Sequence, residues 1–164
     1  MKGATGNSKQ SLEDAIHRVT SDLNEGIQNW INGSVPETDA AFDDISAATP
    51  RRFSYVFTDG GTSVDGAFWC DLRPSWGKNP EFRLATPRRY TKLLLDDERT
   101  VVAEVVELQK AAKAVDRPRH ARRTTLIFIK AQEAEEGLLL WRLHESMIPP
   151  EEEQLLDWSE LEAS

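Results

Sequence analysis

Residues 122–149 read R-R-T-T-L-I-F-I-K-A-Q-E-A-E-E-G-L-L-L-W-R-L-H-E-S-M-I-P, and this stretch decides the fold of the chain. Two apolar runs, 126–129 and 138–143, flank an acidic tip that ends in Gly137, a pattern that predicts a β-hairpin. In the second run apolar side chains leave both sides of the strand. We therefore expect both faces of the sheet to need cover, with helices on one face and something else on the other.

Length, charge and composition limit the classes of protein to which the chain can belong. A chain of 164 residues has the size of one domain, and its net charge of -8 disfavours a nucleic-acid partner. The longest apolar runs are only a few residues, so we expect no membrane span. Residues 1–10 lack the apolar core of a secretory signal and are predicted to be a flexible lead. Together with the single cysteine, Cys70, this predicts a cytoplasmic protein.

The first half of the chain predicts helices. Apolar residues recur every three or four positions between Ser11 and Trp30, which favours one helix with an apolar stripe that lies on a sheet. A short second helix is expected after Ser34. Residues 53–57 predict a short strand, and the following glycine turn leads to a third helix that starts at Thr62 or Ser63.

The second half predicts strands. Residues 81–95 form one bent strand interrupted at Pro87, or two separate strands, and residues 100–109 form the next. The hairpin follows, and an acidic segment after Pro149 and Pro150 predicts one short helix. This order is typical of an α+β fold with three N-terminal helices on a strongly curved, mostly antiparallel sheet. The predicted divisions are a lead (1–10), a single domain (11–149) and an acidic C-terminal extension (150–164).

Four segments carry a resemblance to a known family: N-W-I-N-G-S at 29–34, F-T-D-G-G-T-S-V-D at 57–65, R-R-T-T-L-I-F at 122–128 and W-R-L-H-E-S-M-I-P at 141–149. Over residues 11–149 the chain resembles the nuclear transport factor two-like superfamily, in its SnoaL-like or ketosteroid-isomerase-like branch. The resemblance implies a cone-shaped pocket between helices and sheet. It also implies a homodimer formed by pressing the sheets together. Many relatives carry a second histidine where this chain has Ser146, which follows Trp141, His144 and Glu145.

Two side chains are candidates for proton transfer. His144 shares a strand face with Arg142 and Ser146, so these polar groups either line a cavity or hydrogen-bond inside an interface. Glu104 is flanked by valines, and a desolvated carboxylate there either serves as a general acid or base or forms an ion pair with Arg122 or Arg123.

Aromatic and basic residues are candidates for binding. Tyr55, Trp69 and Tyr90 are candidate pocket walls or plain core residues, and Arg123 or Tyr55 is a candidate for holding an oxyanion. The basic run R-P-R-H-A-R-R at 117–123 is either an anion site or a solvated turn. The three histidines lack ligand spacing, so we expect no metal, and no motif indicates a cofactor.

Three functions are compatible with this pattern. The first is a homodimer with a pocket for a small, partly apolar organic molecule. The second is an isomerase, cyclase or dehydratase that uses a proton-transfer residue in that pocket. The third is an interaction or dimerisation module whose own side chains fill the pocket. The sequence names no ligand.

Overall fold

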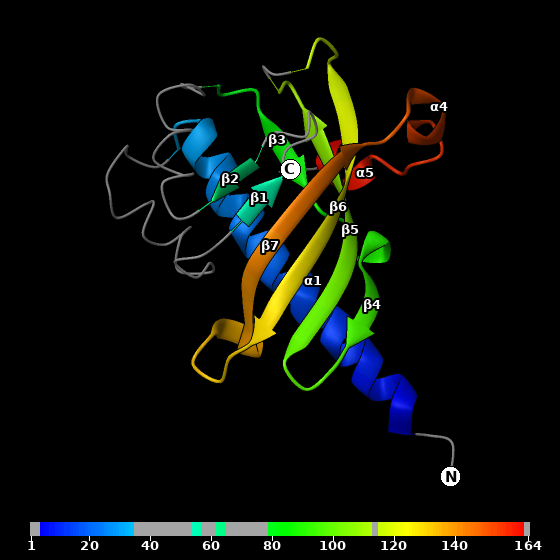
Figure 1. Cartoon of the computed structure of the whole chain (residues 1–164). Coiled ribbons are helices and arrows are strands. Elements are labelled where there is room, and N and C mark those ends of the chain that lie inside the picture. The colour runs from blue at the N-terminus through cyan, green and yellow to red at the C-terminus, as the bar shows by residue number, and fades with distance from the viewer. Residues whose placement is uncertain (1–3, 35–53, 57–61, 65–78, 113–114, 163–164) are drawn as a thin grey trace.

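The structure is a computed structural model, and it describes residues 4–34, 54–56, 62–64, 79–112 and 115–162. These residues form one long helix, a seven-stranded sheet and two short C-terminal helices (Figure 1). The long helix is α1 (Ala4–Ile31), and the short ones are α4 (Pro150–Glu153) and α5 (Ser159–Glu162). The strands are β1 (Ser54–Val56), β2 (Thr62–Val64), β3 (Arg83–Ala85), β4 (Lys92–Asp96), β5 (Thr100–Lys110), β6 (Arg119–Lys130) and β7 (Leu138–Met147).

The predicted hairpin is the centre of the sheet. Its strands β6 and β7 pair antiparallel, and the strand order is β2-β1-β7-β6-β5-β3, with β4 also paired to β5. β1 pairs with β7 in parallel, and every other pairing among the described strands is antiparallel. The structure thus confirms the α+β class and the mostly antiparallel sheet. The expected second helix, and the third helix beyond residue 64, lie outside the described residues.

The observed elements differ from the predicted ones at three places. α1 begins at Ala4, so most of the expected flexible lead is helical, because extending an existing helix adds one hydrogen bond per residue. Residues 62–64 form β2 instead of starting a helix, since the ladder with β1 satisfies their backbone more fully than a local cap can. The C-terminal extension forms two short helices in place of one. Residues 81–95 form two strands, which the 3-10 helix Arg88–Tyr90 separates.

We call the sheet face that α1 covers the inner face. Val101, Ala103 and Val105 of β5 alternate onto this face and pack with Ile16 and Leu23 of α1. Leu126 and Phe128 of β6 and Leu140 and Leu143 of β7 complete this core. α1 is also held at the hairpin turn, where Arg18 Nε lies 2.7 Å from Glu136 Oε1. The predicted apolar stripe of the helix is therefore the stripe that meets the sheet.

The opposite, outer face is covered at one end by the chain's own C-terminus, residues 149–162, which we call the strap. Its Trp158 and Leu161 pack on Val106 and Leu108 of β5 and Ala121 of β6. Figure 1 shows α4 and α5 beside the end of β6 where the strap begins. Further along the outer face, apolar side chains on β5, β6 and β7 remain partly exposed, among them Val102, Ile127, Ile129 and Leu139. The expected cover for the second face is thus partly supplied by the strap.

Candidate functional site

Beyond the apolar core, polar side chains take over the inner face of the sheet. The strand alternation that points Val101, Ala103 and Val105 towards α1 carries on to Glu107 and Gln109. Their register partners on β6 are Arg122 and His120, and Thr124 pairs with Glu145 of β7. We call this set the inner cluster; its members are Glu107, Gln109, His120, Arg122, Thr124 and Glu145. All but Arg122 are buried, and the Arg122 side chain is only 15% exposed.

The two carboxylates of the inner cluster have different partners. Glu145 Oε2 lies 2.8 Å from Arg122 Nη1, so its charge is compensated by a guanidinium. Glu107 instead accepts a hydrogen bond from the Thr124 hydroxyl, 3.1 Å from its Oε1, and a longer one from the Gln109 amide, at 3.5 Å. Both of these donors are neutral. Glu107 is therefore the carboxylate of this cluster whose protonation state is free to change.

The surroundings of Glu107 favour its protonated form. Burial and, to a lesser extent, the nearby Glu145 carboxylate raise the pKa of Glu107 to about 7. Arg122 and the hydrogen bonds from Thr124 and Gln109 oppose it. A carboxyl group with a near-neutral pKa can both give and take a proton at physiological pH, which is what general acid–base chemistry requires.

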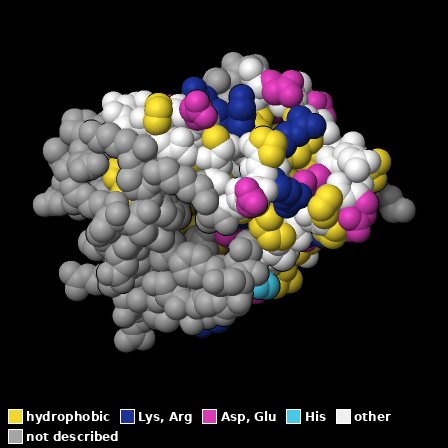
Figure 2. Space-filling model, turned by 90° about the horizontal axis from the view of Figure 1, so that it is seen from above, with side chains coloured by type: hydrophobic (Ala, Val, Ile, Leu, Met, Phe, Trp, Pro, Cys, Tyr) yellow, Lys and Arg dark blue, Asp and Glu magenta, His cyan; other side chains and the backbone are white. Residues whose placement is uncertain are grey.

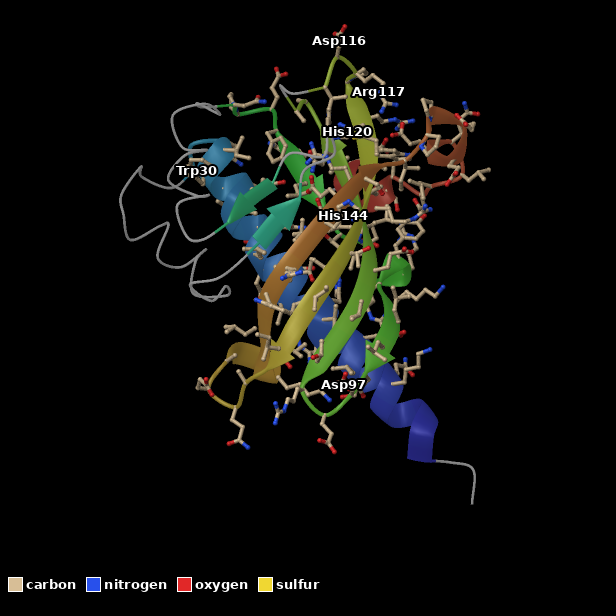
Figure 3. The ribbon with its side chains drawn as sticks, in the orientation of Figure 1. Trp30, Asp97, Asp116, Arg117, His120 and His144 are labelled. Carbon is tan, nitrogen blue, oxygen red and sulfur yellow. The ribbon has the colours of Figure 1, made fainter. Side chains whose placement is uncertain are left out.

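His120 is the second unusual group of the inner cluster. Its side chain is fully buried, and neither Nδ1 nor Nε2 has a hydrogen-bond partner among the residues that the structure describes. Burial, together with the positive charges of Arg122 and Arg117, lowers the pKa of His120 to about 4. The imidazole is therefore neutral at pH 7, with one N–H donor and one lone-pair acceptor unused. Figure 3 shows His120 near the Arg117 end of the sheet.

The proton-transfer candidates from the sequence lie on the outer face. His144, Arg142 and Ser146 share that face, as expected from their spacing, and all three are exposed. Figure 3 shows His144 on β7, farther from the β5–β6 connection at Asp116 than His120 is. Glu104 is partly exposed on the same outer face, and its Oε1 lies 3.8 Å from Arg123 Nε. Of the two possible partners considered for Glu104, the ion pair is with Arg123.

The aromatic candidates are spread over the fold. Tyr90 is half-buried beside the outer-face core that the strap forms, and its hydroxyl oxygen accepts the Asp157 N–H at 2.8 Å. Tyr55 lies in β1, in register with Leu143 of β7. Trp69 lies outside the described residues. Of the basic run at 117–123, Arg117 pairs with Glu153 and Arg123 with Glu152, so the strap neutralises much of it. Seen from above in Figure 2, basic and acidic side chains are interspersed over the described surface.

Sequence reasoning missed the roles of Glu107, Gln109, His120 and Thr124. A signal for Glu107 was present: it stands two residues after Val105, on the face that the preceding apolar alternation had already marked as buried. A carboxylate at such a position needs either a partner or a raised pKa. His120 could not be found in this way, because the basic residues around it indicated a solvated turn.

Among the described residues, no three His, Cys, Asp or Glu side chains lie together in a way that could hold a metal ion. No helix in this part of the chain is both long and apolar enough to cross a membrane.

Solved structures share this arrangement of helix and sheet. An NTF-2-like protein of unknown function from Pseudomonas aeruginosa is similar with a TM-score of 0.65 and 21% sequence identity, over 85% of this chain and 99% of that one. The chain has the nuclear transport factor two-like fold. The chain is also similar to the association domain of CaMKII from C. elegans, with a TM-score of 0.60 and 14% identity over 86% of this chain and 99% of the other.

A third similar structure is the CaMKII hub of S. rosetta, with a TM-score of 0.62 and 11% identity over 82% of this chain and 95% of the hub. No family model matches the sequence, and no curated protein matches it. At these levels of identity the likeness establishes the fold of this nuclear transport factor two-like chain.

Proposed function

We propose that this chain is a self-associating protein that binds a small, partly apolar organic molecule at the inner cluster. The observation that carries the proposal is the burial of Glu107, His120 and Thr124 on a sheet face that is otherwise apolar core. Burying polar groups costs stability unless they are satisfied, and apolar residues at these positions would extend the same core more cheaply. A ligand that uses these groups is a reason for their presence.

A proton-transferring enzyme of the isomerase, cyclase or dehydratase kind is the second candidate. Glu107 favours it, because its raised pKa fits a general acid or base near pH 7. In this version of the proposal Glu107 takes the catalytic role that the sequence had suggested for Glu104 or His144. Turnover would separate the enzyme from a binding protein.

Self-association is supported by two observations. The outer face keeps partly exposed apolar residues between the strap and the hairpin turn, including Ile127 and Ile129. Several similar structures are association or hub domains by name. We place Arg142, His144 and Ser146 in this contact, since they share that face with Ile127 and pair with β6 residues in register. A homodimer through the sheet face is the simplest closed arrangement.

The experiment that tests the binding site is a crystal structure of protein taken directly from the expressing cell. Unexplained density in contact with Glu107 or His120 supports a ligand site. An inner cluster covered by the chain's own packed side chains would instead leave the interaction module, with a filled pocket, as the better description. Static light scattering at micromolar concentration tests the second part of the proposal, since a monomer under these conditions contradicts self-association.

A further inference from the structure

The inner cluster of the proposed binding site carries an unequal number of buried charges. Glu107 and Glu145 are buried carboxylates, and Arg122, whose side chain is 15% exposed, is the guanidinium that faces them among the described residues. The pair between Arg122 and Glu145 is direct, with atoms 2.8 Å apart, so those two charges offset each other. Among the described residues, Glu107 meets only a hydroxyl and an amide. Within this part of the chain one carboxylate thus lacks a direct cationic partner, and it needs either a proton or a positive group from elsewhere.

His120 supplies the second, independent observation. It is fully buried on the same face, on the strand next to that of Glu107 and in register with Gln109. Within the described part of the chain, both of its ring nitrogens lack a hydrogen-bond partner. A neutral imidazole offers a lone pair to a donor. Because burial and the charges of Arg122 and Arg117 keep His120 neutral, it is poorly suited to balance an anion. A hydrogen-bond donor that carries positive charge would match both the Glu107 carboxylate and the lone pair of His120.

We propose that the inner cluster binds the ammonium group of a small organic amine, with Glu107 as its counter-ion and His120 as a neutral hydrogen-bond acceptor. This inference rests on the proposed function and names the chemical class of its ligand. An ammonium group carries three N–H donors. These can bond to the Glu107 carboxylate and to the imidazole lone pair of His120 on the neighbouring strand. A carboxylate ligand would meet the uncompensated charge of Glu107 and would be repelled.

Proton exchange gives the site a measurable signature. Among the described residues, the charged groups that act on Glu107 are Glu145 and Arg122, and His120 lies on β6 two residues from Arg122, the register partner of Glu107. Near pH 7 part of the protein carries a proton on Glu107, and an arriving ammonium group displaces it. Amine binding therefore releases protons, and its affinity rises as the pH rises through about 7. An anion has the opposite dependence, because it favours the protonated carboxyl.

The test is isothermal titration calorimetry of the full chain with three probes of equal length: n-butylamine, butyrate and butanol. We expect butylamine to bind most tightly and to release protons, measured as a dependence of the heat on the ionisation enthalpy of the buffer. Glu107→Gln keeps the shape of the side chain and removes its charge, and we expect it to weaken butylamine binding about tenfold or more. Glu98→Gln, at an exposed turn position, is the matched control and keeps the wild-type affinity.

Three results would overturn the inference. In the first, butyrate or butanol binds as tightly as the amine, and Glu107→Gln loses that binding. This result would keep the site but assign it another class of ligand. The second is amine binding without proton release from the wild-type protein, a measurement that does not depend on any variant folding. The third is the absence of heat from all three probes up to millimolar concentrations. That result would count against the binding site itself, as well as against the amine.

Discussion

Glu153 of the strap accepts a hydrogen bond from the backbone N–H of Ala121, with 2.8 Å between N and Oε1. Ala121 lies in β6, and its carbonyl accepts the Ile148 N–H where β7 ends. The chain then turns away at Pro149, which precedes α4. A side-chain carboxylate thus takes the place that the next carbonyl of β7 would have had in the ladder. The strap is therefore held on the sheet by a hydrogen bond between the Glu153 side chain and the backbone of β6, as well as by apolar contacts.

The first prediction concerns this bond. Glu153→Ala leaves the buried Ala121 N–H unsatisfied and removes the partner of Arg117, which lies 2.9 Å from Glu153 Oε2. We expect the free energy of unfolding to fall by about 2 kcal/mol, measured by urea denaturation. Glu151→Ala, an exposed neighbour in α4, is the control and should change it by less than about 0.5 kcal/mol. Equal effects of the two substitutions would contradict the assigned role.

The second prediction concerns the indole that anchors the strap. Trp158 packs on the outer-face core, and its Nε1 donates to the Glu153 carbonyl at 3.2 Å. Trp158→Ala should destabilise the fold by about 3–5 kcal/mol through cavity formation. Trp158→Phe keeps most of the ring volume and should cost clearly less. If both substitutions cost the same in chemical denaturation, the hydrogen bond, and not packing, would dominate.

The third prediction follows from the raised pKa of Glu107. Because the folded-state pKa of about 7 exceeds the ordinary value of 4.5, the folded protein holds this proton more tightly than the unfolded chain does. Its contribution to stability is full below about pH 4.5 and is lost as the pH rises through 7. Glu107→Gln cannot ionise, so at pH 8 it should be more stable than the wild type by about 3 kcal/mol, an order-of-magnitude figure. If the difference in unfolding free energy between Glu107→Gln and the wild type is the same at pH 5 and at pH 8, the pKa of Glu107 is not raised.

The fourth prediction concerns the unpartnered imidazole. His120→Phe replaces two unsatisfied nitrogens with carbon in a ring of related shape, and we expect about 1 kcal/mol of added stability in thermal and urea unfolding at pH 7. The same substitution should weaken butylamine binding. Added stability together with lost binding would identify His120 as a group retained for a ligand. Lower stability would indicate that the imidazole serves the fold.

The fifth prediction addresses the outer face. Ile127→Asp puts a charge among the partly exposed apolar residues of β6 and should weaken self-association about tenfold or more, measured by light scattering across a concentration series. Lys9→Asp, on the exposed side of α1, is a charge-changing control that should leave the association unaltered. An unchanged oligomer in Ile127→Asp would move the contact away from this face.

Local patterning was enough to predict much of the fold. The apolar stripe of α1 and the two strands of the hairpin could be predicted because their apolar residues repeat with the period of a helix or a strand. The structure pairs Leu126 with Leu143, in agreement with the predicted hairpin. β2 was misassigned because its pairing with β1 is a tertiary event, for which T-S-V alone gives no sign. Periodicity also cannot tell which face of a strand becomes enclosed.

The candidate site was predicted less well for the same reason. Glu104 and Glu107 both stand among valines in the sequence, yet only Glu107 is on the face that α1 and the neighbouring strands bury. His144 attracted attention as a strand histidine, although His120, inside a basic run, is the buried one. Burial arises from the packing of the whole sheet, and with it the pKa values that distinguish these groups.

The parallel pairing of β1 with β7 places Ser54 opposite Arg142. On a ribosome, which releases the chain from its N-terminus, β1 therefore emerges long before the strand that completes its ladder. The apolar stripe of α1 is also made before the strands on which it packs, because its partners on β5, β6 and β7 all belong to the second half of the chain. These sheet contacts of α1 therefore form only after the second half of the chain has been made, and they are long-range contacts of the kind that slow folding.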